Sequence, residues 1–113
     1  MSGRPKKLLF EVQESGRCIQ GWCAGRSYAD YERDRQFRRA VEREFEVIGE
    51  ALARLSRADP VTAERITQLA RIVGFRNRIA HGYDTVDNAL VWGVIEEHLP
   101  RLLAEVEREL NQP

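Results

Sequence analysis

The 113-residue sequence contains very little of several residue types that define common classes of protein. It has two cysteines and two histidines, and Lys6 and Lys7 are its only lysines. Cys18 and Cys23 lie five positions apart in one predicted helix, which is poor placement for a disulfide bridge. Neither has metal-ligand spacing to a histidine. We therefore predict two small, reduced core cysteines, no metal and no cofactor.

Net charge is absent as well, because Lys+Arg and Asp+Glu each total 18. The chain has no overall attraction to nucleic acid, so any affinity for RNA has to come from a local patch. The preference for arginine over lysine fits genome base composition as well as phosphate recognition, and we favour the first. No apolar run approaches the ~20 residues of a membrane span, and no signal peptide is evident. We expect a cytoplasmic protein without membrane contact.

No segment alternates apolar and polar residues with a period of two, so no sheet is predicted. Apolar residues recur instead at helical spacing. The clearest stripe lies in residues 34–57, and its members are Phe37, Val41, Phe45, Ile48, Leu52 and Leu55. Further helices are predicted over 6–24, from Ser27, from Pro60 and over 86–110. We expect one all-α domain, residues 6–110, folded as an up-and-down bundle of four or five helices, with flexible ends at 1–5 and 111–113.

Proline and glycine mark the expected helix boundaries. Asp59-Pro60 is a start signal, in which a capping carboxylate precedes a proline at the first helical position. Gly74 is a candidate point for dividing the helix that follows. Pro100 removes one helical hydrogen bond, so we predict that the last helix is kinked near Glu96.

Chemically distinctive side chains gather in one stretch, from Gly74 to Tyr83. His81 is a natural proton carrier because its unperturbed pKa lies near neutrality. Arg76 presents a planar cationic fork that fits phosphate oxygens. An arginine, the Asn77 amide and a histidine around one point can stabilise a phosphoryl transition state and move its protons.

Helical geometry limits how these side chains can meet. Asn77 and His81 share a face at i and i+4, whereas Arg76 and His81 point about 140° apart on a regular helix. Gly82 can end the helix and leave His81 in the last turn, free to swing. Alternatively, a second subunit completes the site across a two-fold axis.

Each of these residues also has a purely structural interpretation. His81 near a helix end interacts well with the helix dipole without any catalytic purpose, and on pattern alone that interpretation is favoured. Arg76 fits a surface ion pair, while Asn77 and Arg78 fit a solvated helix face. Tyr83 fits an interfacial aromatic that anchors the loop.

The stretch nevertheless resembles a known family. Arg76-x4-His81-x-Tyr83 is similar to the R-x4-H-x-Y signature of HepT-type HEPN-domain toxins, from bacterial and archaeal HepT–MntA toxin–antitoxin systems. Two flanking segments, residues 45–51 and 91–100, and the pair Asp34-Arg35 match as well. The resemblance covers about residues 5–110, and it is weakest over residues 56–69.

This resemblance implies a HEPN-like bundle and a metal-independent endoribonuclease toxin of a type VII-like pair. It implies that Arg76 and His81 are catalytic. From the residues themselves, Asn77 can orient the His81 ring from one turn back, and Arg78 can widen an RNA-binding patch. The resemblance also implies a homodimer and products with a cyclic phosphate. The implied partner is an MntA-like nucleotidyltransferase antitoxin, which neutralises the toxin by AMPylation of Tyr83. A higher hetero-oligomer of toxin and antitoxin is a further expectation, and its stoichiometry stays open.

Two other functions remain open. The domain can be a non-catalytic regulatory or substrate-binding subunit of a minimal nucleotidyltransferase, with the motif as a nucleotide-phosphate site. It can also be a purely structural helical dimer. Among the remaining polar residues, Asp34 and Glu50 can support the site or Arg76, but we favour a solvated helix face for both and assign them no catalysis. We interpret His98 as structural. Trp22 and Trp92 fit core or dimer-contact positions.

Overall fold

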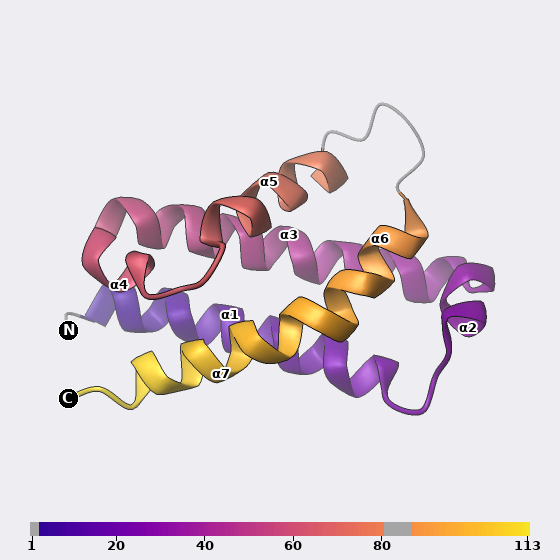
Figure 1. The fold of residues 1–113 in the computed structure, drawn as a ribbon, viewed down its shortest axis with the longest axis horizontal. Coiled ribbons are helices and arrows are strands. Elements are labelled where there is room, and N and C mark those ends of the chain that lie inside the picture. Colours follow the sequence, from indigo (N-terminus) through magenta and orange to yellow (C-terminus); the bar gives the residue numbers. More distant parts are fainter. Residues whose placement is uncertain (1–2, 81–86) are drawn as a thin grey trace.

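A computed structural model describes residues 3–80 and 87–113. Within these ranges the chain forms helices and no strand, which confirms the all-α prediction. The helices are α1 (Gly3–Cys23), α2 (Tyr28–Arg33), α3 (Arg35–Ala58), α4 (Pro60–Glu64), α5 (Leu69–Ala80), α6 (Asn88–Gly93), the π-helical turn η1 (Val94–His98) and α7 (Leu99–Leu110). The long helices α1, α3, α5 and the run from α6 to α7 alternate in direction (Figure 1). None of the described helices is long and apolar enough to cross a membrane.

Helix α3 forms the centre of the bundle. All six members of its predicted apolar stripe are buried, which confirms that interpretation. They pack with Leu9, Val12 and Ile19 of α1 and with Leu99 and Val106 of α7 in one core. Helix α3 packs mainly against α1 and α5, and α7 packs mainly against α1. Helix α5, which carries Arg76, is therefore seated on α3.

Side-chain caps begin the helices where the sequence predicted starts. Ser27 and Asp30 form a reciprocal capping box at the start of α2. Asp34 caps α3, because its carboxylate accepts from the backbone N–H of Phe37 at 3.0 Å. Asp59 caps α4 in the same way, and Pro60 follows it. Asp34 is thus a helix cap rather than part of a solvated helix face.

The helix expected after Pro60 is divided, but not at Gly74, which lies inside α5. The division falls between α4 and α5, where Gln68 adopts a left-handed backbone conformation with φ of 57°. There Thr67 donates from its backbone N–H and its hydroxyl to Glu105 of α7, at 2.9 and 2.6 Å. The connection is thus tied to the last helix, and it sets where α5 begins.

Pro100 disturbs the last helix close to where the kink was predicted. The disturbance is the π-helical turn η1, and Pro100 lies in the first turn of α7 directly after it. Proline lacks an N–H and clashes with the carbonyl one turn earlier, and a wider turn accommodates both effects. Helix α6 begins at Asn88 behind its cap Asp87, two residues later than expected.

Helix α1 differs from its prediction in three respects. It begins at Gly3, so residues 3–5 are helical rather than loose. Cys18 is exposed, so it is not a core residue. Cys23 is half-buried, and this burial raises the pKa of its thiol to about 11. Trp22 is 39% exposed and lies outside the core. Trp92 of α6 packs against Tyr31, with 5.4 Å between the ring centroids, as expected for a core position.

Candidate active site

The seat of α5 on α3 fixes which of its side chains face the bundle. The ring of Phe75 packs edge-on against Phe45 of α3, with 5.2 Å between the ring centroids. Ile79, one turn further on, is buried, and Ile72, one turn earlier, packs against the core. This spacing of three and four residues makes one apolar stripe along α5. Arg76, next to Phe75, consequently projects along the edge of the α3–α5 contact.

A glycine on α3 makes room for Arg76. A Cβ atom built at Gly49 would overlap the Cβ and Cγ atoms of Arg76. The backbones of α3 and α5 therefore approach each other closely at Gly49, and any side chain larger than that of glycine would prevent this approach. The arginine stem lies across the Gly49 backbone, and its side chain is 27% exposed.

The guanidinium of Arg76 is held on two sides. Its Nη2 donates to Oε2 of Glu50 at 2.8 Å, and its Nη1 donates to the side-chain oxygen of Asn77. The other carboxylate oxygen of Glu50 accepts from Nε of Arg54 at 3.0 Å. An arginine has five N–H donors. Two are used among the described residues, so the remaining donors are available for an anion.

Glu50 is the site residue for which the sequence interpretation favoured the wrong one of two alternatives. Its side chain is 40% exposed, but it pairs with Arg76 rather than only meeting solvent, so the solvated-face interpretation is wrong. In the sequence it belongs to a row of glutamates on α3 with no feature that sets it apart. The only available signal was its neighbour Gly49, because a glycine inside a long helix often marks close packing.

Arg76 opens onto a hollow of about 410 Å³ between α1, α3 and α5. Its lining mixes charges of both signs, and most of these charges are paired with one another. The lining residues are Glu11, Arg43, Glu46, Val47, Glu50, Ala51, Arg54 and Arg76. The hollow thus gives the Arg76 guanidinium access to solvent, with acidic groups close by.

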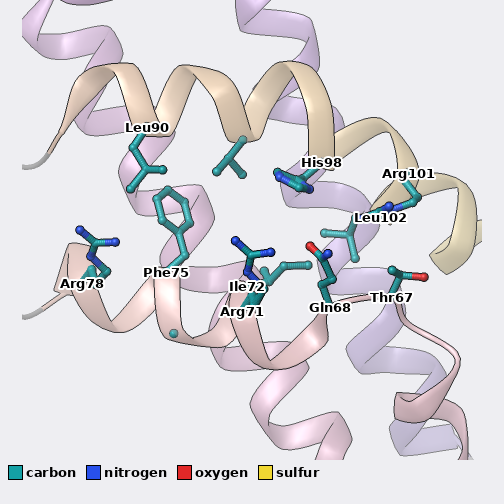
Figure 2. A pocket seen from close by; sticks show the side chains of 12 residues that line it. Thr67, Gln68, Arg71, Ile72, Phe75, Arg78, Leu90, His98, Arg101 and Leu102 are labelled. Atoms are coloured by element: carbon teal, nitrogen blue, oxygen red, sulfur yellow. The ribbon is translucent and has the colours of Figure 1, made fainter.

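Of the other predicted site residues, the structure describes Asn77 and Arg78 but not His81 and Tyr83. Asn77 is exposed and bonds to Arg76, so it contributes to the setting of that side chain. Arg78 is exposed and lines a different groove, which Arg76 does not line (Figure 2). His81 and Tyr83 lie outside the described residues, and the roles proposed for them stay predictions. In the described part of the chain, no group of three or more His, Cys, Asp or Glu side chains could hold a metal ion.

A comparison of the sequence with known protein families identifies the family of this chain. The profile of the family described as Ribonuclease HepT-like matches residues 12–109, which is nearly the whole chain. The chain belongs to this HepT-like family. The match includes the α3 segment with Gly49 and Glu50, all of α5, and the motif from Arg76 to Tyr83.

Individual relatives have the same length. One, named as a candidate RNase of Methanocaldococcus jannaschii, is 29% identical over 102 residues, which cover 90% of this chain and 93% of the relative. Another, also named as a candidate RNase, comes from Caldanaerobacter subterraneus subsp. tengcongensis. It is 28% identical over 108 residues, 96% of each chain. No solved structure matches the chain significantly. These HepT-like relatives match the domain end to end.

Proposed function

We propose that this chain is a metal-independent endoribonuclease and the toxin of a toxin–antitoxin pair. Membership of the HepT-like ribonuclease family supports the reaction class. The observation that carries the proposal here is the setting of Arg76. Its guanidinium is fixed by Glu50 and Asn77 five residues before His81, and its other donors make no hydrogen bond within residues 3–80 and 87–113. Preorganised donors of this kind stabilise charge that develops on a phosphate in the transition state.

In the proposed reaction the ribose 2′-hydroxyl attacks the adjacent phosphorus. A new bond forms between the 2′-oxygen and phosphorus, and the bond from phosphorus to the 5′-oxygen breaks. His81 takes the proton from the 2′-hydroxyl or gives one to the leaving 5′-oxygen. Arg76 holds the phosphate oxygens, with Asn77 in support. The products carry a 2′,3′-cyclic phosphate and a 5′-hydroxyl.

Regulation by a partner is part of the proposal. A nucleotidyltransferase antitoxin transfers AMP from ATP to the hydroxyl of Tyr83 and releases pyrophosphate. Tyr83 is two residues from His81, so the added phosphates bring negative charge next to the motif. That charge competes with an RNA phosphate for Arg76 and blocks cleavage. Two copies of the chain form the active dimer.

The first experiment incubates purified protein with tRNA and with total cellular RNA, in the presence of a chelator. Arg76→Ala is compared with Arg54→Ala, which removes the other arginine bound to Glu50 and leaves the motif intact. We expect Arg76→Ala to lower the cleavage rate by about 100-fold or more, and Arg54→Ala to stay near wild type. His81→Ala should abolish fragments with cyclic-phosphate ends.

Mass spectrometry of Tyr83 accompanies this assay, because a modified preparation is expected to be inactive. Tyr83→Phe cannot be AMPylated, so it should cleave RNA even after incubation with the antitoxin and ATP. If unmodified wild-type protein leaves these RNAs intact, the nuclease proposal fails for them. The non-catalytic subunit of a nucleotidyltransferase then becomes the better account.

A further inference from the structure

A second hollow lies on the opposite side of α5 from Arg76. It is a groove of about 320 Å³ between α5 on one side and the run from α6 to α7 on the other. It exists because α5 rests mainly on α3 while α7 rests mainly on α1. The facing surfaces of α5 and α7 are therefore left as two walls. We call it the α5–α7 groove.

The floor of the α5–α7 groove is apolar. Ile72 and Phe75 come from α5, and Leu90, Val94 and Leu102 come from the opposite wall. Leu90 is 39% exposed, so part of this apolar side chain is accessible from the groove. Figure 2 shows Phe75 and Leu90 facing each other across the groove near Arg78. A flat apolar group fits between such walls.

The rim of the α5–α7 groove is cationic. Arg71 and Arg78 line it from α5, and Arg101 and His98 line it from the opposite wall (Figure 2). No acidic residue lines it within the described chain. None of these three arginines pairs with an acid among residues 3–80 and 87–113, whereas the arginines around the other hollow pair with glutamates. In a chain of zero net charge, this groove is a local site for an anion.

The cations are spread along the groove rather than gathered at one point. Arg71 and Arg78 are seven residues apart on one helix, about 10 Å along its axis. Arg101 lies toward the far end of the opposite wall (Figure 2). A single small anion cannot meet all of them, but a chain of phosphates can. Apolar faces between cations are also how proteins hold unpaired bases.

The position of the groove connects it to the candidate active site. Arg78 is two residues from Arg76 on α5, and Leu90 lies at the start of α6. The end of the groove marked by these two residues is thus formed by the helices on either side of the segment that carries His81. An RNA strand whose phosphate is held at Arg76 can continue around α5 past Arg78, where the groove offers it a cationic path.

From these observations we propose that the α5–α7 groove binds single-stranded RNA next to the cleaved phosphate. An unstacked base lies against Phe75 and Leu90, and backbone phosphates contact Arg71, Arg78 and Arg101. Double-stranded RNA is excluded, because its paired bases cannot enter an apolar groove of this size. This inference rests on the proposed ribonuclease function, and it names the part of the chain that holds the substrate.

The test separates binding from cleavage. A fluorescent single-stranded RNA with 2′-O-methyl groups lacks the attacking hydroxyl, so its affinity for the intact protein is measured without turnover. The double variant Arg71→Gln/Arg101→Gln is compared with Arg17→Gln/Arg35→Gln, which makes the same change in net charge at exposed arginines outside the groove. We expect the groove variant to weaken binding about tenfold or more and the control variant by less than twofold. Each lost phosphate contact also makes the salt dependence weaker: the negative slope of the logarithm of the binding constant against the logarithm of the salt concentration decreases in magnitude by about 0.7.

A third variant tests the apolar floor. Leu90→Gln should weaken binding several-fold and leave the salt slope unchanged, because it removes a base contact and no charge. Circular dichroism checks that each variant is folded. In the cleavage assay, the groove variants should raise KM and leave kcat nearly unchanged.

The outcomes distinguish this inference from the proposed function. If wild type cleaves RNA and the groove variants match the control, the nuclease stands and the groove proposal is overturned. If RNA binds through the groove but is never cleaved, the groove proposal is supported and the nuclease proposal fails. Groove substitutions that weaken only the homodimer or the nucleotidyltransferase complex overturn the proposal and assign the groove to a protein partner.

Discussion

The ion pair between Arg76 and Glu50 joins residues that are 26 positions apart in the chain. Arg54 shares the same carboxylate, so one glutamate holds two guanidiniums. A partly exposed pair of this kind contributes little to stability, usually below about 1 kcal/mol. The larger effect of the ion pair is on the orientation of the Arg76 guanidinium, because the pair fixes this planar group before a phosphate binds. Glu50 is therefore a positioning residue in the proposed reaction.

Glu50→Gln tests this role. The amide keeps the shape of the side chain and one acceptor oxygen, but it loses the charge that holds Arg76. We expect kcat for RNA cleavage to fall about tenfold, because a catalytic group that is held less firmly spends less time in the reactive geometry. KM should not rise, since the change also removes a negative charge near the RNA phosphates. Single-turnover and steady-state kinetics on one RNA substrate measure both quantities.

Glu46→Gln is the matched control, because Glu46 lines the same hollow and contacts Arg43 rather than Arg76. It should change kcat by less than twofold. Equal losses in the two variants contradict a positioning role for Glu50, and point instead to the overall charge of the hollow.

At this scale the sequence singled out Arg76, but it offered Glu50 only as a less favoured partner, together with Asp34. Arg76 stands in a recognisable spacing with His81, whereas Glu50 follows Glu42 and Glu46 at intervals of four on the outer face of α3. All three look like solvated charges from sequence alone. Only the placement of α5 over Gly49 separates Glu50 from the others, and that placement is a long-range property of the fold.

Among the elements, the crossing of α3 and α5 at Gly49 matters most for the site. A glycine in a helix interior costs up to about 1 kcal/mol relative to alanine. At Gly49 this cost is offset by the close approach that seats Arg76. Gly21 of α1 has no such purpose, since nothing lies within 4 Å of a Cβ atom built there.

These two glycines give opposite predictions for the same substitution. Gly49→Ala should lower the free energy of unfolding by about 1–3 kcal/mol, because a Cβ atom forces α3 and α5 apart. Gly21→Ala should raise it by up to about 1 kcal/mol through better helix propensity. Urea unfolding followed by circular dichroism measures both. A stabilised Gly49→Ala variant is incompatible with the close crossing described here.

The elements also show where sequence patterns stop being informative. The α3 stripe and the caps at Ser27 and Asp59 were readable because their determinants lie within a few residues. The division between α4 and α5 was not, because Thr67 is held there by Glu105 of α7, 38 positions later. Gly74 was a false signal, since α5 gains enough from packing on α3 to continue through it.

For the whole molecule, the zero net charge hides an uneven distribution. One side of α5 faces a hollow in which arginines and glutamates pair, and the other side faces the α5–α7 groove, where arginines line the rim without acids in the described chain. Composition alone gave no overall attraction to nucleic acid and required a local patch for any RNA affinity. The folded molecule offers one local cationic surface next to the candidate active site.

The proposed homodimer determines how Arg76 and His81 meet. Five residues apart, they point about 140° away from each other on a regular helix, so a site that combines Arg76 of one chain with His81 of the other avoids the conflict. We therefore predict that Arg76→Ala and His81→Ala complement each other. When the two variants are co-expressed with different affinity tags, about half of the dimers are mixed, and each mixed dimer has one intact site of two. The mixture should therefore recover about a quarter of wild-type activity.

The purified mixed dimer provides the sharper measurement, because sequential affinity steps remove both parental dimers. It should show about half of the wild-type rate per dimer if each site takes one residue from each chain. A dimer of Arg76→Ala/His81→Ala double-variant chains, carrying the same two tags, is the control and should be inactive. If the mixed dimer is equally inactive, while sedimentation shows that it is intact, Arg76 and His81 act within one chain.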